Sequence, residues 1–265
     1  MRITILLFAA FAQTTVNASQ IALTNGTETC IVDTLGGRVL SYCVEGKELL
    51  WRNESPIQVA EEWAHGGIPI AWPWFGRIGA GDAHIHGYAW KREFRVTGRT
   101  DSQVVLSLET ESLLLKYEIE LAHGLSLCVE TTSKSDFPYP MSVAFHPYFL
   151  VGERDRVSIE GIDAVAVSIT NAVDRSVKFE GAAPYRIYRI YDAVFERTIC
   201  IEAQNSTGVN LWNPGSEMNC PGAIPRDAWR RFVSIEPFAA GINRLLVLEP
   251  HGKHVLRMKA ISSLP

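Results

Sequence analysis

The sequence predicts an all-β protein, a mostly antiparallel sandwich, on three observations. Apolar and polar residues alternate with a period of two along most of the chain, which is typical of strands with one buried face. Turn-forming residues separate these runs at intervals typical of sandwiches and barrels. Helical periodicity is nearly absent. Together these patterns predict one β domain without a helical layer.

The alternating runs can be followed in chain order. The first, Thr27 to Val44, bends at Gly36-Gly37, and a later pair of runs meets at the turn His123-Gly124. The stretch from Arg226 to Arg231 is the one candidate for a helical turn or two. The remaining predicted strands are Val104 to Leu108, Leu113 to Leu121, Leu125 to Thr131, Ser176 to Phe179, Thr198 to Glu202, Gly208 to Trp212, Arg231 to Ile235, Leu245 to Leu248 and Val255 to Ile261.

Residues 1–18 differ from the rest of the chain. Arg2 gives a positive start, an apolar stretch runs from Ile3 to Ala12, and small residues end at Ala18. This pattern predicts a secretory signal peptide, and ten apolar residues are too few to span a bilayer. The alternative is an apolar first strand. We therefore expect a single domain over residues 19–265 and export to the secretory pathway or periplasm; without a genuine signal peptide, the location would be cytoplasmic.

Charge and cysteine content limit the partners that the chain could have. A net charge of −4, spread along the chain, gives no basic surface for nucleic acid or an anionic membrane. The five cysteines show no C-x-x-C spacing, so neither a zinc site nor a redox motif is indicated. Cys30 and Cys43 flank the Gly36-Gly37 turn, although spacing alone does not establish a disulfide. We expect a monomer that binds a small molecule.

The long loop over residues 52–92 is the most unusual segment. It combines glycines and prolines, which restrict the backbone to particular geometries, with the aromatic rings of Trp72, Trp74 and Phe75 and with the imidazole of His86. A rigid loop with flat aromatic walls and a titratable ring is a common way to build a sugar site. The alternative is a core-filling loop with an incidental histidine.

Two further segments carry ionisable groups where a predicted strand gives way to a loop. His146 and Glu236 each precede a proline, which biases both residues towards extended backbone. Either side chain could face a cleft, or His146 could be an ordinary buried histidine. A metal site is a third interpretation, with His84 and His86 on one strand face and Glu93 and His146 as further ligands. The sequence spacing from His86 to Glu93, and the many glycines and prolines of the loop, argue against it, so we expect no metal and no cofactor.

Taken in order, these motifs resemble the hexose-6-phosphate mutarotases, also called glucose-6-phosphate 1-epimerases, of the galactose mutarotase-like superfamily of aldose 1-epimerases. The resemblance covers nearly the whole chain after residue 18 and implies a single large twisted β-sandwich with a sugar cleft. The residues that carry it are Gly66-Gly67-Ile68-Pro69, Trp72-Pro73, Phe75-Gly76, His86-Gly87-Tyr88-Ala89, His146-x-Tyr148-Phe149, Leu211-Trp212-Asn213-Pro214-Gly215 and Trp229 to Pro237.

The resemblance also implies a mechanism and residue roles. Anomers interconvert when an acid protonates the ring oxygen while a base removes the proton of the anomeric hydroxyl, so the ring opens and recloses on its other face. His146 would be the acid, Glu236 the base and His86 a sugar contact, without metal or cofactor. Trp212 and Asn213 would support the wall of the cleft.

Four departures from the family pattern concern recognition. His65 stands where an arginine is typical, and Ile85 stands where a glutamine is typical. Trp90 stands where an arginine is typical, and the basic residues Lys91 and Arg92 come only after it. An Asp-Arg-Ile-Tyr motif reads Tyr188-Arg189-Ile190-Tyr191 here. Each lost charge-assisted contact costs roughly 1.5–3 kcal/mol of phosphate affinity.

His65, Trp90, Arg92 and Tyr188 are therefore our candidate substrate contacts beside His86. We predict an aldose or hexose-6-phosphate 1-epimerase. Two alternatives are kept: a non-catalytic carbohydrate-binding sandwich, and a metal-dependent sugar isomerase.

Overall fold

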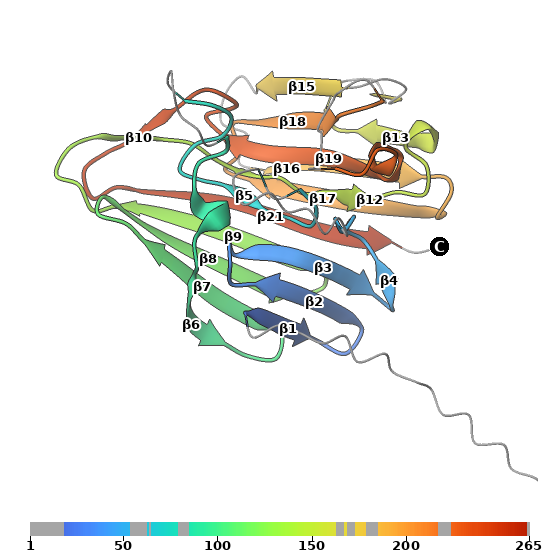
Figure 1. Ribbon diagram of the computed structural model, residues 1–265, viewed down its shortest axis with the longest axis horizontal. Helices are drawn as coiled ribbons and strands as arrows, with labels where there is room; N and C mark the ends of the chain where they lie inside the picture. Colours follow the sequence, from blue (N-terminus) through green and yellow to red (C-terminus); the bar gives the residue numbers. More distant parts are fainter. Residues whose placement is uncertain are drawn as a thin grey trace, which may run out of the picture.

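The computed structural model describes residues 19–53, 63, 65–78, 85–162, 167–168, 173–178, 185–216 and 224–263. The predicted signal peptide, His84 and Cys220 lie outside these residues. Within them the regular structure consists of strands and three short 3₁₀ turns, which confirms the all-β prediction (Figure 1). The turns are η1 (Ala89–Lys91), η2 (Arg154–Arg156) and η3 (Ala228–Arg231). No helix in this part of the chain has the length and apolar character needed to cross a membrane.

A nine-stranded sheet forms one layer of the sandwich, and its neighbouring strands all pair antiparallel. In spatial order its strands are β14 (Val167–Ser168), β13 (Val157–Glu160), β16 (Tyr185–Asp192), β17 (Arg197–Gln204), β21 (Lys253–Ser263), β9 (Leu125–Ser133), β8 (Leu113–Leu121), β7 (Gln103–Glu109) and β6 (Arg95–Arg99).

Smaller sheets form the facing layer. The four-stranded sheet has the order β1 (Gln20–Thr24), β2 (Glu28–Asp33), β3 (Arg38–Val44), β4 (Lys47–Glu48). The six-stranded sheet has the order β15 (Val173–Lys178), β18 (Gly208–Asn213), β19 (Phe232–Ala239), β11 (Val143–Phe145), β5 (Ile70–Ala71), with β12 (Phe149–Leu150) also paired to β19. A separate pair joins β10 (Tyr139–Met141) to β20 (Leu246–Leu248).

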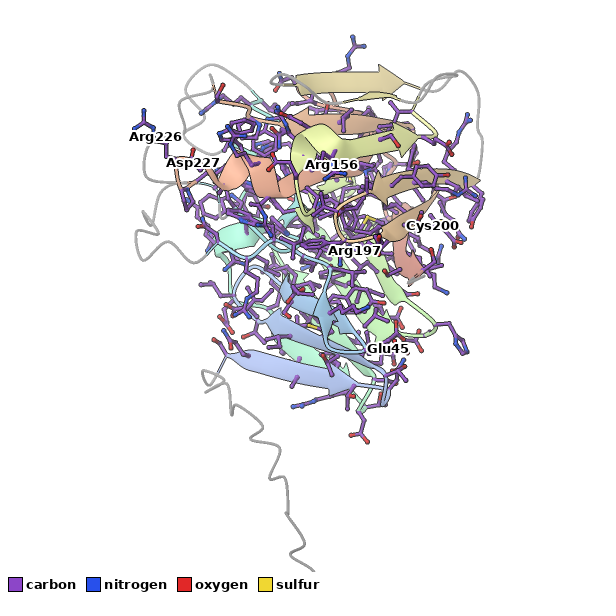
Figure 2. All side chains as sticks on the ribbon, turned by 90° about the vertical axis from the view of Figure 1, so that its right-hand side faces the viewer. Glu45, Arg156, Arg197, Cys200, Arg226 and Asp227 are labelled. Carbon is purple, nitrogen blue, oxygen red and sulfur yellow. The ribbon has the colours of Figure 1, made fainter. Side chains whose placement is uncertain are left out.

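One apolar core holds the two layers together. In β8 and β9 every second side chain is buried, so a slip of one residue in register would turn the whole apolar set outward. β2 packs on β8, and β11 and β19 pack on β21. Buried Arg197 of β17, labelled in Figure 2, adds a polar link by donating to the carbonyl oxygens of Glu48 and Leu150.

The predicted runs agree with the observed strands in the regions of strict alternation. β1, β6, β13 and β16 are among the strands that were not predicted, and the predicted helical segment is the single 3₁₀ turn η3. Cys30 lies opposite Tyr42 rather than Cys43 in the β2–β3 ladder, and Cys30, Cys43, Cys128 and Cys200 are free thiols. The register therefore explains why these two cysteines do not pair.

Candidate active site

Neighbouring strands of the six-stranded sheet bring His146 and Glu236 together. His146 follows β11, Glu236 lies in β19, and the two strands pair antiparallel next to these positions. The His146 Nε2 atom is 3.4 Å from the Glu236 Oε1 atom, and the side chains are only 5% and 1% exposed. Two groups with acid–base chemistry therefore share one desolvated space.

The other polar atoms of the pair are also held by the sheet. On β18, Asn210 lies opposite Glu236, and its Nδ2 donates to Glu236 Oε2 at 3.3 Å. On the far side of the imidazole, His146 Nδ1 is 3.2 Å from the hydroxyl of Ser234, which donates to the carbonyl oxygen of Pro147 at 2.6 Å. Each group of the pair thus has a partner that fixes its orientation.

His86 is held by the backbone of the long loop. Its Nδ1 accepts the Gly76 N–H at 3.1 Å, while its own N–H donates to the Gly76 carbonyl at 2.8 Å. Because Nδ1 accepts, the neutral ring must carry its proton on Nε2. Burial, then the neighbouring His65 and Arg77, lower the pKa of His86 to about 3. His86 is therefore a permanent neutral donor near pH 7.

His65 joins the same group of rings. Its Nδ1 is 2.7 Å from the Tyr148 hydroxyl, which also accepts the indole N–H of Trp63 at 3.1 Å. Its ring stacks on Trp212 at 6.1 Å and 16°. Burial lowers the pKa of His65 to about 4. A second neutral imidazole thus stands at the position where the resemblance predicts an arginine.

Aromatic rings form the walls around the three imidazoles. Trp63 lies 4.5 Å from His86 and 5.5 Å from His146 between ring centroids, and 5.9 Å from Trp90. His146 stacks on Tyr148 at 4.9 Å and 16°. We call Trp63, His65, His86, His146, Tyr148 and Trp212 the histidine cluster. Its flat faces suit the apolar faces of a sugar ring.

Close backbone approaches hold the loop in place. Gly67 donates to the Trp51 carbonyl and adopts φ 69°, and a Cβ there would lie 2.1 Å from the Val39 carbonyl oxygen. At Gly87 (φ 73°) a Cβ would lie 2.1 Å from the Trp72 oxygen. Both positions need glycine, because a side chain would collide with the backbone. Two glycines of the motifs are thereby explained.

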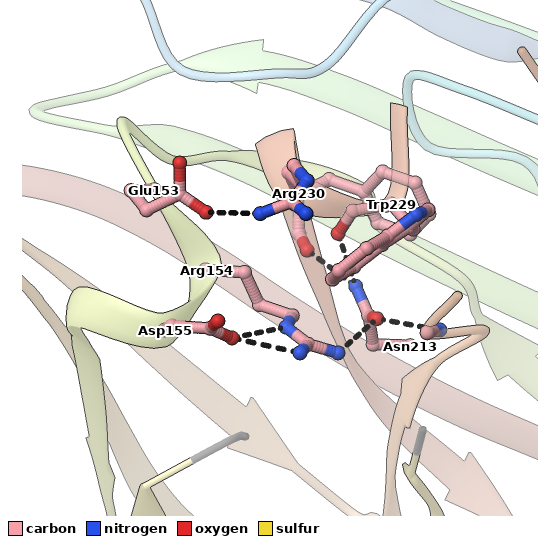
Figure 3. Close-up of polar contacts among 8 residues, drawn as sticks. Glu153, Arg154, Asp155, Asn213, Trp229 and Arg230 are labelled. Atoms are coloured by element: carbon pink, nitrogen blue, oxygen red, sulfur yellow. Dashed lines mark hydrogen bonds and ion pairs between the residues drawn. The ribbon is translucent and has the colours of Figure 1, made fainter. Parts of the chain in front are cut away.

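A second polar network supports the wall behind Trp212. The buried guanidinium of Arg154 lies between Asp155 and Asn213, over the ring of Trp229 (Figure 3). Asn213 Nδ2 donates to the carbonyl oxygens of Trp229 and Phe232, at 2.8 and 2.7 Å. This network ties the end of β18 to the start of β19. These contacts are made by Asn213; Trp212, the other residue expected to support the wall, stacks on Phe232 with ring centroids 5.8 Å apart.

Of the five predicted substrate contacts, three lie in or beside the histidine cluster and two lie away from it. His86 and His65 lie in the histidine cluster, and Trp90 packs on its edge against Trp63 with its indole N–H on the Gly87 carbonyl. Arg92 is exposed, with its guanidinium 5.8 Å from the Tyr88 ring centroid. Tyr188 faces the sandwich core from β16 and is fully buried. Neither of the last two has a contact with the cluster among the described residues.

Four residues near the pair escaped prediction as functional groups. Trp63, Tyr148, Asn210 and Ser234 all touch the catalytic candidates or their rings. Ser234 had a usable signal, because it lies two residues before Glu236 and so shares its face of the strand. Trp63 had no such signal in the sequence, because its contacts with His86 and His146 depend on the path of the long loop.

The described residues contain no group of three or more histidine, cysteine, aspartate or glutamate side chains placed to hold a metal ion. His84, which the metal interpretation required, lies outside them, and Glu93 is exposed beside η1. Of the other two ligands of that interpretation, His86 accepts the Gly76 N–H at Nδ1, and His146 contacts Glu236 and Ser234.

The chain is similar to known proteins of one kind. The sequence profile described as aldose 1-epimerase matches residues 19–180. A "putative glucose-6-phosphate 1-epimerase" of Salmonella typhimurium is 26% identical over 231 residues, 76% of each chain. One of the same description from Cenchrus ciliaris is 24% identical and covers 97% of this chain and 88% of its own.

Solved structures share the fold. The crystal structure of a "putative mutarotase" from Salmonella typhimurium superposes with a TM-score of 0.78 at 20% identity, covering 93% of this chain and 90% of the other. A galactose mutarotase related enzyme from Lactobacillus acidophilus gives 0.73 at 13% identity, covering 92% and 97%. At these identities the likeness concerns the fold, a galactose mutarotase-like sandwich.

Proposed function

Because the chain belongs to the aldose 1-epimerase family, and is therefore an isomerase that interconverts sugar anomers, we propose that His146 and Glu236 are its catalytic pair. The observation that carries this assignment is the 3.4 Å approach of Nε2 to Oε1 in a site from which water is largely excluded. An acid and a base held this close can act on two oxygens of one sugar carbon centre.

The reaction then runs with balanced protons. The Glu236 carboxylate takes the proton of the anomeric hydroxyl, and His146 Nε2–H gives its proton to the ring oxygen as the bond from that oxygen to C1 breaks. The aldehyde forms, the C1–C2 bond rotates, and the free hydroxyl attacks the other face of the carbonyl. His146 takes back its proton from that hydroxyl, and Glu236 returns its own to the carbonyl oxygen.

Burial constrains where the proton resides in the pair. Desolvation, then the neighbouring His86 and His65, lower the pKa of His146 well below its ordinary value, while its own backbone carbonyl opposes this. An imidazolium here depends on the nearby carboxylate of Glu236, since opposite charges within a few ångströms favour the charged form. The pair therefore works as one unit that holds a single proton.

For the substrate we propose a free aldose in preference to a sugar phosphate. His65 and His86 are neutral near pH 7 because their pKa values are lowered, so they offer single hydrogen bonds rather than charge. A dianionic phosphate loses its hydration on burial and needs charged partners in return. A neutral sugar hydroxyl is matched by one neutral donor.

Polarimetry of fresh α-glucose, α-galactose and glucose 6-phosphate, with and without a chelator, tests these proposals. We expect faster mutarotation of a free hexose, unchanged by the chelator. Glu236→Gln keeps the shape of the side chain and should lower kcat by about 10²–10⁴-fold. Near-normal activity of this variant would show that the assignment is wrong. Sugar binding without acceleration would indicate a non-catalytic module, which the comparisons do not favour.

Domain organisation, export and assembly remain proposals from the sequence. We propose a leader over residues 1–18, a single domain over residues 19–265 and a monomer that binds neither nucleic acid nor membrane. The support is the charged and apolar pattern before Ala18 and the dispersed net charge of −4. Mass spectrometry of protein from its native source would reveal a chain beginning at Ser19, whereas a chain that retains Arg2 would contradict export.

A further inference from the structure

Ser234 occupies a position between the catalytic imidazole and the backbone. It is fully buried on β19, two residues before Glu236, so both side chains project from the same face of the strand. Its hydroxyl oxygen is 2.6 Å from the carbonyl oxygen of Pro147 and 3.2 Å from His146 Nδ1. Two groups, a carbonyl and an imidazole, thus meet at one hydroxyl that has one proton.

The chemistry of these three groups permits a single arrangement. A carbonyl oxygen only accepts, so the serine proton points to Pro147. The serine oxygen must then accept from His146, which requires a proton on Nδ1. We infer that Ser234 is a positioning residue that fixes His146 in the Nδ1–H form and leaves Nε2 as the one ring nitrogen that exchanges protons.

This inference rests on the proposed function, because it assigns the fixed tautomer a task in each half of the reaction. During ring opening Nε2 faces the sugar and Glu236, so the proton leaves from the correct side of the ring. During ring closure the neutral imidazole must accept a proton on Nε2, and a ring with its proton already there could not do so. A fixed Nδ1–H keeps Nε2 open in every turnover.

Nitrogen NMR of protein labelled with ¹⁵N-histidine tests the tautomer directly. We expect the neutral His146 ring to show a protonated Nδ1 and an unprotonated Nε2, assigned by loss of its signals in His146→Asn. In Ser234→Ala the ring should lose this single form and show both tautomers. An Nε2–H ring in the unmodified protein would overturn the inference, whatever the enzymatic activity is.

Kinetics distinguish positioning from simple packing. Ser234→Ala should lower kcat roughly 10–100-fold and change KM less than about threefold, because the acid–base step is impaired and the sugar contacts remain. Ser234→Thr keeps the hydroxyl and should recover most of kcat and the single tautomer. Ser133→Ala is the matched control: it removes another buried serine hydroxyl, in β9, and should leave kcat unchanged.

The remaining outcomes are also decisive. A Ser234→Ala protein with wild-type kcat and an unchanged tautomer would show that Ser234 only fills space. If the unmodified enzyme accelerates mutarotation of none of the sugars tried, the proposed function fails, while the NMR result still decides the tautomer. If Ser234→Ala does not fold, the NMR spectrum of the unmodified protein and the kcat of Ser234→Thr carry the test.

Discussion

The two halves of the site hold their histidines in opposite ways. In the loop half, His86 Nδ1 accepts a backbone N–H from Gly76, so its Nε2 always carries a proton. In the sheet half, His146 Nδ1 donates to Ser234, so its Nε2 is free to gain and lose one. The same side chain is thereby a fixed donor in one half and a proton carrier in the other. Recognition and reaction are divided between them.

The halves are also built with different precision. The loop half depends on glycines whose backbone touches other carbonyls, as at Gly67 and Gly87. The sheet half depends on register, since the period of two along β19 aligns Ser234 with Glu236 and the β18 pairing adds Asn210. A strand register is fixed over many residues at once, whereas a loop geometry is fixed at a few points. His146, which transfers protons, belongs to the half whose geometry is fixed by strand register.

Removing the proton carrier should have the largest effect. His146→Asn keeps a polar side chain but cannot donate or accept at the Nε2 position. We expect kcat to fall by about 10²–10⁴-fold with little change in KM, measured by polarimetry. A sugar-induced change in tryptophan fluorescence should persist, because Trp63 and Trp212 remain in place. A variant that retains more than about a tenth of the wild-type kcat would place the acid elsewhere.

The fixed donor should matter less. His86→Asn loses one neutral hydrogen bond to the sugar, which corresponds to about 0.5–1.5 kcal/mol, or roughly 2–13-fold in KM. We expect kcat to change less than KM, in contrast to His146→Asn. Thermal unfolding of both variants is the control for loop integrity, since His86 also bonds Gly76. If His86→Asn lowers kcat as much as His146→Asn does, the division between the halves is wrong.

The sequence predicted the sheet half of the site better than the loop half. Local signals, a proline and an alternating run, placed His146 and Glu236 at strand ends. The structure brings the two side chains into contact, but Glu236 lies within β19 (Phe232–Ala239) rather than at its end, so that part of the prediction was wrong. Tyr188 was predicted as a sugar contact, but its parity along β16 directs it into the core. The pairing of Ser234 with Pro147 joins segments 87 residues apart, which no local pattern reveals.

Strand prediction failed for similar reasons. β8 and β9 alternate strictly and were predicted, whereas β16 carries arginine and tyrosine between its buried residues and was not recognised. Amphipathic side chains such as these cover apolar surface with their stems, so polarity alone misstates which positions are buried. Because β16 was not recognised, the nine-stranded sheet to which it belongs was not fully predicted.

Acid should weaken the fold through the histidine cluster. The pKa values of His65 and His86 are lowered to about 4 and about 3, below the ordinary 6.5. Below pH 6.5 the unfolded chain therefore binds protons on these two rings, while the folded chain keeps the rings neutral. The free energy of unfolding is thus undiminished above that pH and falls as pH decreases. At pH 5 we expect a loss on the order of 1–2 kcal/mol for each ring.

Calorimetry at pH 7.5 and pH 5.0 measures this loss as a decrease in Tm of several degrees. His86→Gln removes one of the titrating rings of the cluster and should show a smaller decrease between the two pH values than the unmodified protein. An unchanged Tm, or one that rises on acidification, would mean that these imidazoles are not held neutral in the folded protein.

The smallest effect is expected at Arg92. Its exposed guanidinium lies over the Tyr88 ring, and such a contact at the surface stabilises a protein by about 0.5–1 kcal/mol. Because it has no contact with the histidine cluster among the described residues, Arg92→Ala should change kcat/KM for a free hexose by less than about twofold. Arg95→Ala, at another exposed arginine three residues along the chain, is the matched control.

A tenfold loss of kcat/KM in Arg92→Ala alone would show that Arg92 reaches the sugar after all. If that loss were confined to glucose 6-phosphate, recognition of the phosphate would extend from the loop half over η1, and the proposed preference for a free aldose would be wrong.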